Sequence, residues 1–128
     1  MTNTKNTTMS ITSTRYVLAV PGLQRSANWY RDILGFEVFE IGDPGWRFAR
    51  RGACYLMLGE CPDAIPPNEL GSHSYFAYLI CEDIDALYQE FIGRGAPVRQ
   101  PPQDRPWGMR EFPLTTIDGH RIMFGQAV

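Results

Sequence analysis

The sequence has no long apolar run, no excess of positive charge and few cysteines or histidines. No stretch approaches the roughly 20 apolar residues that a membrane helix needs, so no membrane partner is expected. The 12 lysine and arginine residues are balanced by 14 aspartate and glutamate residues, and no basic run occurs, which argues against a nucleic-acid partner. The first ten residues, MTNTKNTTMS, lack the apolar centre of a signal peptide, which favours a cytoplasmic location.

Disulfide frameworks and common catalytic motifs are also missing. The three cysteines, Cys54, Cys61 and Cys81, are odd in number and lack C-x-x-C spacing, so they are predicted to be reduced thiols. The sequence contains no G-x-G-x-x-G, Walker A, G-x-S-x-G or H-E-x-x-H motif. The dinucleotide-binding, P-loop, serine-hydrolase and zinc-peptidase classes that these motifs mark are therefore not indicated.

The sequence does contain a pattern of strands and helices that occurs twice. At 128 residues, with 44% hydrophobic and 20% charged residues, the chain is long enough for one domain with its own core. Alternating or β-rich runs predict strands, apolar stripes at helical spacing predict helices, and glycine or proline marks the breaks. The predicted elements are a strand at 14–20, a helix at 23–34, strands at 36–41, 46–50 and 53–58, a strand at 74–81, a helix at 84–94, a short strand at 96–98 and two strands within 105–126.

The two halves align as an internal repeat. Val20 and Cys81 end the first strand of each half and are 61 positions apart, as are Leu23 and Ile84 at the helix starts. This order predicts an α+β fold of two βαβββ modules in tandem, with curved sheets around a cavity and a helix on the outer face of each sheet. The predicted organisation is a disordered tail at 1–12 and a single domain at 13–128, with halves at about 13–60 and 72–128 joined by a proline-rich loop at 59–73.

Five segments between Arg15 and Gln126 carry a resemblance to a known family. They read LQRSANWYRDILGFEV, DPGWRFARRG, CEDIDALYQEF, RPWGMR and IDGHRIMFGQ. In this order they resemble the vicinal oxygen chelate superfamily, which includes glyoxalase I, extradiol dioxygenases, fosfomycin resistance enzymes and bleomycin resistance proteins. They are most similar to the bleomycin resistance branch. The resemblance implies the glyoxalase/bleomycin resistance fold and a homodimer.

The metalloenzymes of that superfamily hold a divalent ion with one inward side chain from each of four strands. The resemblance maps these positions onto Arg15, Met57, Phe76 and Met123. A guanidinium, a thioether and a phenyl ring are not ligands for a hard divalent ion. Neither histidine has a companion at ligand spacing, and His120 follows a turn, where it is expected in solvent. We therefore expect no metal site and no cofactor.

The expected function is to hold a small organic molecule. The predicted cavity lining is apolar and aromatic with a few polar tips, which suits a flat or amphipathic ligand. The alternative is that the aromatic side chains simply fill the cavity. A resemblance to bleomycin resistance proteins implies antibiotic sequestration, but a net charge of −2 attracts a cationic drug only weakly and favours a neutral or anionic ligand. The candidate ligand-binding residues are Arg15, Trp46, Phe48, Tyr55, Met57, Phe76, Tyr78, Trp107, Arg110 and Met123.

A catalytic function stays open through Arg110 and Glu111. Adjacent strand residues point to opposite faces, so one of the two faces the cavity, and the sequence does not say which. An arginine there would clamp a carboxylate or phosphate, whereas a glutamate would act as a base if desolvation raised its pKa. The alternative function is thus a glyoxalase-like lyase or isomerase, or a dioxygenase, with Glu111 as the candidate catalytic residue and a metal or acid–base site that the sequence does not reveal.

Overall fold

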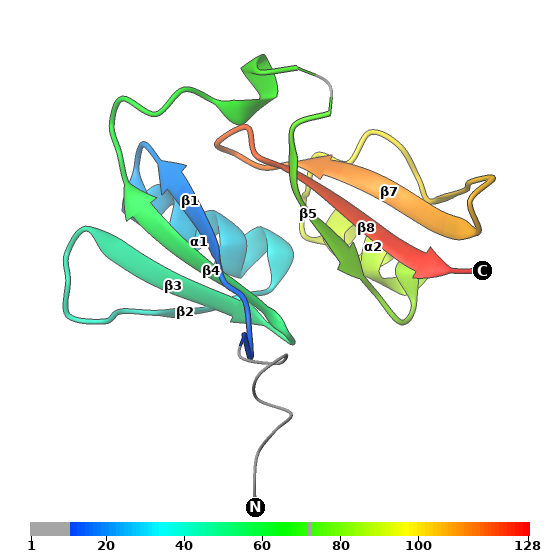
Figure 1. Ribbon diagram of the computed structural model, residues 1–128, viewed down its shortest axis with the longest axis horizontal. Coiled ribbons are helices and arrows are strands. Elements are labelled where there is room, and N and C mark those ends of the chain that lie inside the picture. Colours follow the sequence, from blue (N-terminus) through cyan, green and yellow to red (C-terminus); the bar gives the residue numbers. More distant parts are fainter. Residues whose placement is uncertain (1–10, 72) are drawn as a thin grey trace, which may run out of the picture.

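Two four-stranded sheets lie side by side, and one helix packs against the same side of each (Figure 1). The computed structural model describes residues 11–71 and 73–128. A short 3₁₀ helix, Pro67–Glu69, lies in the segment that joins the two halves. The helices and strands are β1 (Tyr16–Val20), α1 (Leu23–Leu34), β2 (Glu37–Phe39), β3 (Trp46–Arg51), β4 (Cys54–Glu60), β5 (Tyr75–Ile80), α2 (Ile84–Gly93), β6 (Gln103–Asp104), β7 (Met109–Thr115) and β8 (Arg121–Ala127).

The two sheets have the same topology. The strand order is β1-β4-β3-β2 in the first sheet and β5-β8-β7-β6 in the second. In each sheet the first strand of the module runs parallel to the fourth, and the other neighbours are antiparallel. The predicted α+β fold of two βαβββ modules is therefore confirmed, with the two sheets separate rather than closed into a barrel.

The predicted short strand at 96–98 is wrong, and the second strand of this module is β6 instead. The backbone amide of Ala96 donates to Phe91 O at 2.9 Å, and that of Val98 donates to Ala96 O at 2.9 Å. Pro97 has no amide hydrogen to donate to a neighbouring strand. The segment therefore has its hydrogen bonds satisfied locally, at the end of α2, and pairing resumes only at Gln103.

Each helix is tied to its sheet by a side chain at or near the end of the fourth strand of its module. Glu60, the last residue of β4, accepts a hydrogen bond from the backbone amide of Leu23 at 3.4 Å. Gln126, near the end of β8, accepts one from the amide of Ile84 at 3.0 Å. Both amides begin a helix and have no partner within it, so the two side chains cap equivalent helix starts. This shared contact is further structural evidence of the repeat.

The core lies between the helices and the sheets. The predicted stripe of α1 is buried, and its Tyr30 packs edge to face against Phe36 with ring centroids 5.6 Å apart. In the second module, Phe112 and Phe124 stack at 5.1 Å, and Phe91 of α2 packs against both rings. Strand residues of the opposite parity point away from this core, which leaves one face of each sheet without a helix over it.

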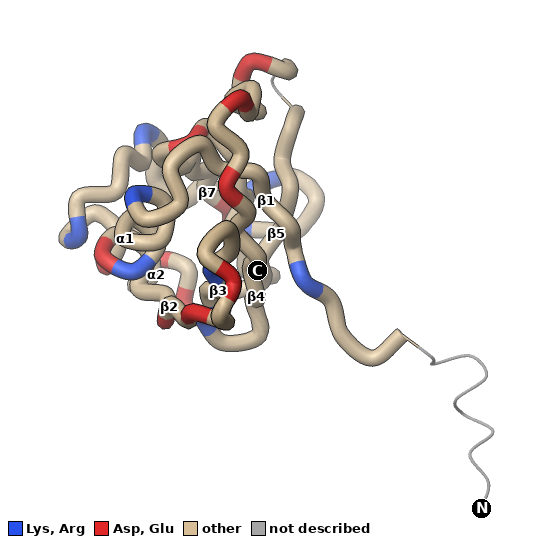
Figure 2. Tube along the Cα trace, turned by 90° about the vertical axis from the view of Figure 1, so that its left-hand side faces the viewer, with Lys and Arg blue, Asp and Glu red and all other residues tan. Residues whose placement is uncertain are grey.

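Polar contacts join the modules at both ends of their junction. Arg51 at the end of β3 forms a two-pronged ion pair with Glu90 of α2, at 2.7 and 2.8 Å. At the other end, Ser26 of α1 donates to buried Asp118 in the β7–β8 turn at 2.5 Å. Figure 2, turned by 90°, shows both helices on one side of the molecule and β1, β4 and β5 towards the other. The two uncovered sheet faces therefore point the same way.

The N-terminal residues and the two helices bear on two further predictions. Of the predicted disordered tail at 1–12, residues 1–10 lie outside the described residues. Neither helix in the described part of the chain has the length and apolar character to cross a bilayer.

Candidate functional site

The uncovered face of each sheet, which we call the open face, carries exposed apolar side chains. Val17 on β1 is 62% exposed and Ile80 on β5 is 71% exposed, whereas on the helix side Leu18 of β1 is buried and Leu79 of β5 is partly buried. Trp107, in the loop before β7, is 66% exposed beside the second sheet. Exposed large apolar side chains mark a binding surface where they form a continuous patch.

The open face of the first sheet has a continuous apolar row. Met57 of β4 lies between Val17 of β1 and Phe48 of β3, and Phe48 pairs in turn with Phe39 of β2. Beside this row the Trp46 ring lies across Gly59, where an added Cβ would come within 2.9 Å of the indole. A glycine inside a strand often marks such a close approach. The predicted residues Trp46, Phe48 and Met57 are thus brought together on one surface.

A second row on the same face combines aromatic rings with cations. The guanidinium of Arg15 lies 4.2 Å from the centre of the Tyr55 ring, which is within cation–π range. Arg50 approaches Tyr55 at 5.8 Å and Phe39 at 5.5 Å, and also forms an ion pair with Glu37 at 2.5 Å. The predicted residues Arg15 and Tyr55 therefore lie together on the open face, beside the apolar row.

The open face of the second sheet is organised around a buried carboxylate. Glu111 of β7 is only 4% exposed. The Tyr78 hydroxyl donates to its Oε2 at 2.5 Å, Trp107 Nε1 donates to the same oxygen at 3.2 Å, and Arg105 Nε lies 3.8 Å from Oε1. Burial of the hydroxyl, reinforced by its bond to Glu111, raises the pKa of Tyr78 to about 12. Tyr78 therefore stays protonated and remains a hydrogen-bond donor at neutral pH.

The structure answers the question that the sequence left open about Arg110 and Glu111. Glu111 pairs with Gly125 on the open face, and Arg110 points to the helix side. There Arg110 binds Asp85 of α2 at 2.9 Å and Asp104 of β6 at 3.1 Å. Arg110 therefore holds structural elements together, and the structure does not place this predicted ligand-binding residue at the open face.

Phe76 is also displaced from its predicted position. The register of β5 against β8 shifts between Tyr75 and Ala77, so the regular alternation breaks at Phe76. Its ring packs edge to face against Tyr16 at 5.6 Å and against His120 at 5.9 Å. Phe76 borders a small pocket on the open face, but its ring mainly fills the junction between the modules.

The expectation that His120 lies in solvent is wrong. His120 is 5% exposed because its turn packs against both the linker and the first module. Gly119 approaches Asn68 and Pro66 of the linker, and Asp118 binds Ser26 of α1. Burial lowers the pKa of His120, so the imidazole is neutral at neutral pH.

Two pockets lie along the open face of the second sheet. A pocket of about 430 Å³ is bordered by Tyr78, Trp107, Glu111 and Met123. A second pocket of about 460 Å³ lies at the β7–β8 turn end of the face, and its lining includes Arg99 and Arg121. Arg99 was not among the predicted site residues. It lies in the coil after α2, where no periodicity in the sequence connects it to a sheet face.

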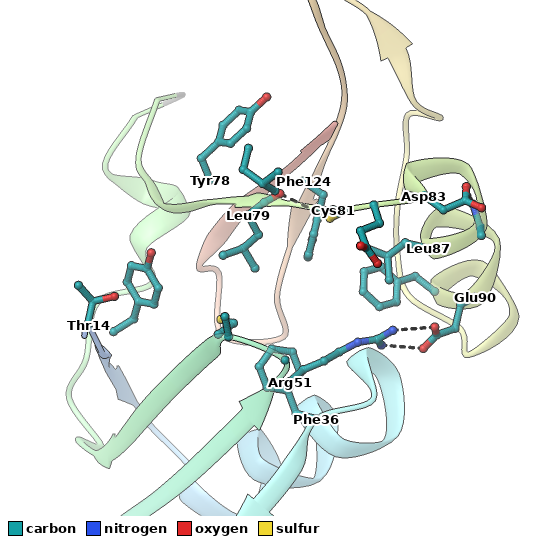
Figure 3. Close-up of a pocket in the computed structure, with 18 residues that line it drawn as sticks. Thr14, Phe36, Arg51, Tyr78, Leu79, Cys81, Asp83, Leu87, Glu90 and Phe124 are labelled. Atoms are coloured by element: carbon teal, nitrogen blue, oxygen red, sulfur yellow. Dashed lines mark hydrogen bonds and ion pairs between the residues drawn. The ribbon is translucent and has the colours of Figure 1, made fainter. Parts of the chain in front are cut away.

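A third cavity, of about 710 Å³, lies between the modules on the helix side (Figure 3). Its lining includes the ion pair of Arg51 and Glu90 and apolar residues such as Phe36, Leu79 and Phe124. Cys54 and Cys81 also line it. Burial raises the pKa of Cys54 to about 11 and also raises that of Cys81, so both remain thiols at neutral pH. Neither is set up as a nucleophile.

The side chains at the four mapped positions do not fit a divalent metal site. Among residues 11–71 and 73–128, no three His, Cys, Asp or Glu side chains are grouped as metal ligands. Met57 and Met123 lie on the open faces, Arg15 binds an aromatic ring, and Phe76 packs at the junction. No chemistry routed through a divalent ion follows from these side chains.

Comparisons with known proteins agree with this architecture. The sequence model of the Glyoxalase/Bleomycin resistance protein/Dioxygenase superfamily matches residues 12–124. No curated protein sequence matches the chain. Among solved structures, a bleomycin-binding protein in complex with bleomycin superposes with a TM-score of 0.74 at 23% identity, covering 91% of this chain and 98% of that one.

Two further solved structures have the same fold. A bleomycin resistance determinant encoded on transposon Tn5 has a TM-score of 0.74 at 23% identity, covering 90% of this chain and 97% of that one. TioX from Micromonospora sp. ML1 has a TM-score of 0.68 at 20% identity, covering 91% of this chain and 100% of that one. At these identities the likeness establishes the fold.

Proposed function

Because this chain belongs to the Glyoxalase/Bleomycin resistance protein/Dioxygenase superfamily, we propose that it binds a small organic molecule with an aromatic or other apolar framework on its open faces. The observation that carries the proposal is the set of large apolar side chains left exposed on these faces, above all Val17, Ile80 and Trp107. Apolar walls with a few fixed polar groups are typical of small-molecule sites. Met57, Phe48 and Tyr55 supply walls, while Tyr78 and Glu111 supply fixed polar atoms.

Sequestration without chemistry is the role that the side chains support best. A bleomycin-binding protein with the same fold has been solved in complex with bleomycin. In this chain the buried thiols are protonated and the positions mapped for metal ligands are a guanidinium, two thioethers and a phenyl ring. Antibiotic sequestration in the cytoplasm is one use of such a protein.

We further propose that the site is completed by a second copy of the chain. No described element covers the open faces, and Val17 and Ile80 stay exposed there. The face of one sheet placed over that of a partner would enclose the ligand and remove the exposed apolar side chains from water. Sedimentation velocity should therefore give about twice the chain mass of 14.6 kDa. A sharp monomer mass at micromolar concentration would contradict the dimer.

The binding function is tested with N-phenyl-1-naphthylamine, a neutral aromatic probe whose fluorescence rises in apolar surroundings. We expect the protein to bind it, and the variant carrying Trp46→Ala and Trp107→Ala to bind it at least about tenfold more weakly, because both indoles are wall groups. Trp29→Phe is the matched control, since Trp29 packs against Tyr30 within the helix layer. Unchanged affinity in the double variant would place the site elsewhere.

A catalytic role is the second candidate, favoured by the burial of Glu111 beside Tyr78. A carboxylate held among aromatic side chains is a suitable base for a bound substrate. Metal content and catalytic turnover distinguish a binding protein from an enzyme. One divalent ion per chain in protein purified without a histidine tag, with an activity lost on chelation, would favour a lyase or dioxygenase and contradict simple binding.

A further inference from the structure

We propose that the pocket at the β7–β8 turn end of the second open face binds an anionic group, and that the ligand is therefore an organic acid carrying a carboxylate, phosphate or sulfonate. This inference rests on the proposed binding function and specifies its ligand class. The pocket has a volume of about 460 Å³. Its lining combines Arg121 of β8, Arg99 of the coil after α2, and the hydroxyl-bearing side chains of Tyr75, Thr115 and Thr116.

The charge of Arg121 is fixed in place without being neutralised. Its Nη1 donates to the carbonyl oxygen of Gly71 at 2.8 Å, and its Nη2 donates to that of Asn68 at 3.1 Å. Both acceptors are neutral backbone groups, so the linker orients the guanidinium and leaves its full positive charge. A pre-oriented cation of this kind is suited to a carboxylate or phosphate, because little flexibility is lost on binding.

Arg99 supplies a second, uncommitted cation. It makes no hydrogen bond or ion pair with any residue in the part of the chain that the structure describes. Most other arginines do pair with a carboxylate, as Arg25 does with Asp118 and Arg51 does with Glu90. No aspartate or glutamate is among the described residues that line the pocket. Two arginines in one pocket without an acidic side chain repel each other, and an anion between them would relieve that repulsion.

The position of this pocket also gives the ligand a direction. Along β8 the open-face residues run from Arg121 through Met123 to Gly125, and Gly125 pairs with Glu111. At about 3.3 Å per residue, the cationic pocket lies roughly 13 Å from the buried carboxylate. Met123 and Pro113, which pair across the strands, form an apolar surface between them. The anionic group would therefore lie at Arg99 and Arg121, and the apolar body would extend towards Trp107, because Glu111 repels a second anion.

The test uses two probes that share an aromatic framework and differ by one sulfonate: 1-anilinonaphthalene-8-sulfonate and neutral N-phenyl-1-naphthylamine. Affinities are measured by calorimetry for the full chain, with circular dichroism as the check of folding. We expect the native protein to bind the sulfonate at least about tenfold more tightly than the neutral probe. Arg99→Gln and Arg121→Gln should each reduce this preference several-fold and leave the affinity for the neutral probe unchanged.

The control is Arg31→Gln, which removes the same charge from the exposed surface of α1, where Arg31 pairs with its neighbour Asp32. It should leave the preference intact. Arg99→Gln keeps the test decisive even if Arg121→Gln unsettles the linker, since Arg99 contacts no described polar group. Inorganic sulfate should compete with the sulfonate probe but not with the neutral one.

The outcomes separate the two proposals. Equal affinities for both probes in the native protein would overturn the anion pocket and leave the binding function standing. A preference for the sulfonate that survives both pocket variants but disappears in Arg15→Gln would assign the anion to the first sheet, and would also overturn the pocket. Failure of the native protein to bind either probe would refute the proposed function itself.

Discussion

The open faces of the two modules have the same backbone and opposite chemistry. In the fourth strand of each module a glycine lies under an aromatic ring, with Gly59 of β4 under Trp46 and Gly125 of β8 under Tyr78. Opposite Gly59 the neighbouring strand carries Trp46, whereas opposite Gly125 it carries Glu111. The first face is thus a hydrocarbon surface edged by arginines, and the second contains a buried carboxylate. A duplicated fold can therefore present a site whose two walls recognise different parts of one ligand.

The largest expected difference between the modules is the stability lost when a side chain on the helix side of the sheet is truncated. The equivalent positions are Arg47, which follows Trp46, and Phe112, which follows Glu111. Phe112 is fully buried and stacks on Phe124, whereas Arg47 is half-buried and bonds Gln24 at 3.5 Å. Phe112→Ala should lower the free energy of unfolding by about 3–5 kcal/mol, because it leaves a cavity among aromatic rings. Arg47→Ala should cost less than about 1 kcal/mol. Urea denaturation measures both, and equal losses would show that the inner faces are more alike than the structure indicates.

An intermediate difference is expected when one hydroxyl is removed from each open face. Tyr78→Phe deletes the donor at 2.5 Å from the buried Glu111 carboxylate and should cost about 1.5–3 kcal/mol of stability. Tyr55→Phe deletes an acceptor that Arg50 reaches at only 3.4 Å and should cost less than about 0.5 kcal/mol. Thermal unfolding of the two variants is the measurement. If Tyr78→Phe were neutral, Glu111 would not depend on its hydroxyl partner.

The smallest difference concerns two ion pairs and their response to acid. The hydrogen bonds and charge of Arg51, with help from Arg94, lower the pKa of Glu90 to about 2. A carboxyl whose pKa is lowered in the folded state stabilises the protein above its unfolded pKa, near 4.5, and loses that contribution as the pH falls towards 2. Arg51→Met should remove on the order of 1 kcal/mol of acid-sensitive stability, given the partial exposure of the pair.

Arg50→Met is the matched control, because the pair of Arg50 with Glu37 is more exposed and lies within one module. Its stability profile between pH 7 and pH 2 should parallel that of the native protein. A profile for Arg51→Met that also runs parallel to the native one would contradict a role for Glu90 in joining the modules.

Local patterns in the sequence predicted most of the elements, and contacts between distant segments account for the misplacement of His120. The stripe of α1 from Leu23 to Leu34 and the stop at Gly35 are local features, and both appear in the structure. His120 was misplaced because its turn is covered by the linker and by Ser26, which are remote in the chain. Alternation showed that Arg110 and Glu111 face opposite sides, but only the three-dimensional pairing with Gly125 shows which one faces the site.

The positions of the candidate site residues were predictable in part for the same reason. Trp46, Phe48 and Met57 alternate regularly and lie together, whereas the register shift beside Phe76 follows from no residue pattern. The close packing at Gly59 and Gly125 was predictable in principle, since a glycine within a strand often marks the close approach of another group. Arg99 was not, because its place depends on how the coil after α2 returns to the sheet.

The cap on α2 makes the last residues of β8 important for a helix far upstream. Gln126 supplies the hydrogen bond that begins α2, 42 positions earlier, and also donates to the carbonyl of Glu82. Truncation after Gly125 would therefore release the start of α2, which carries Glu90 and so the ion pair to Arg51. A change of three residues at one terminus would in this way loosen the junction between the modules.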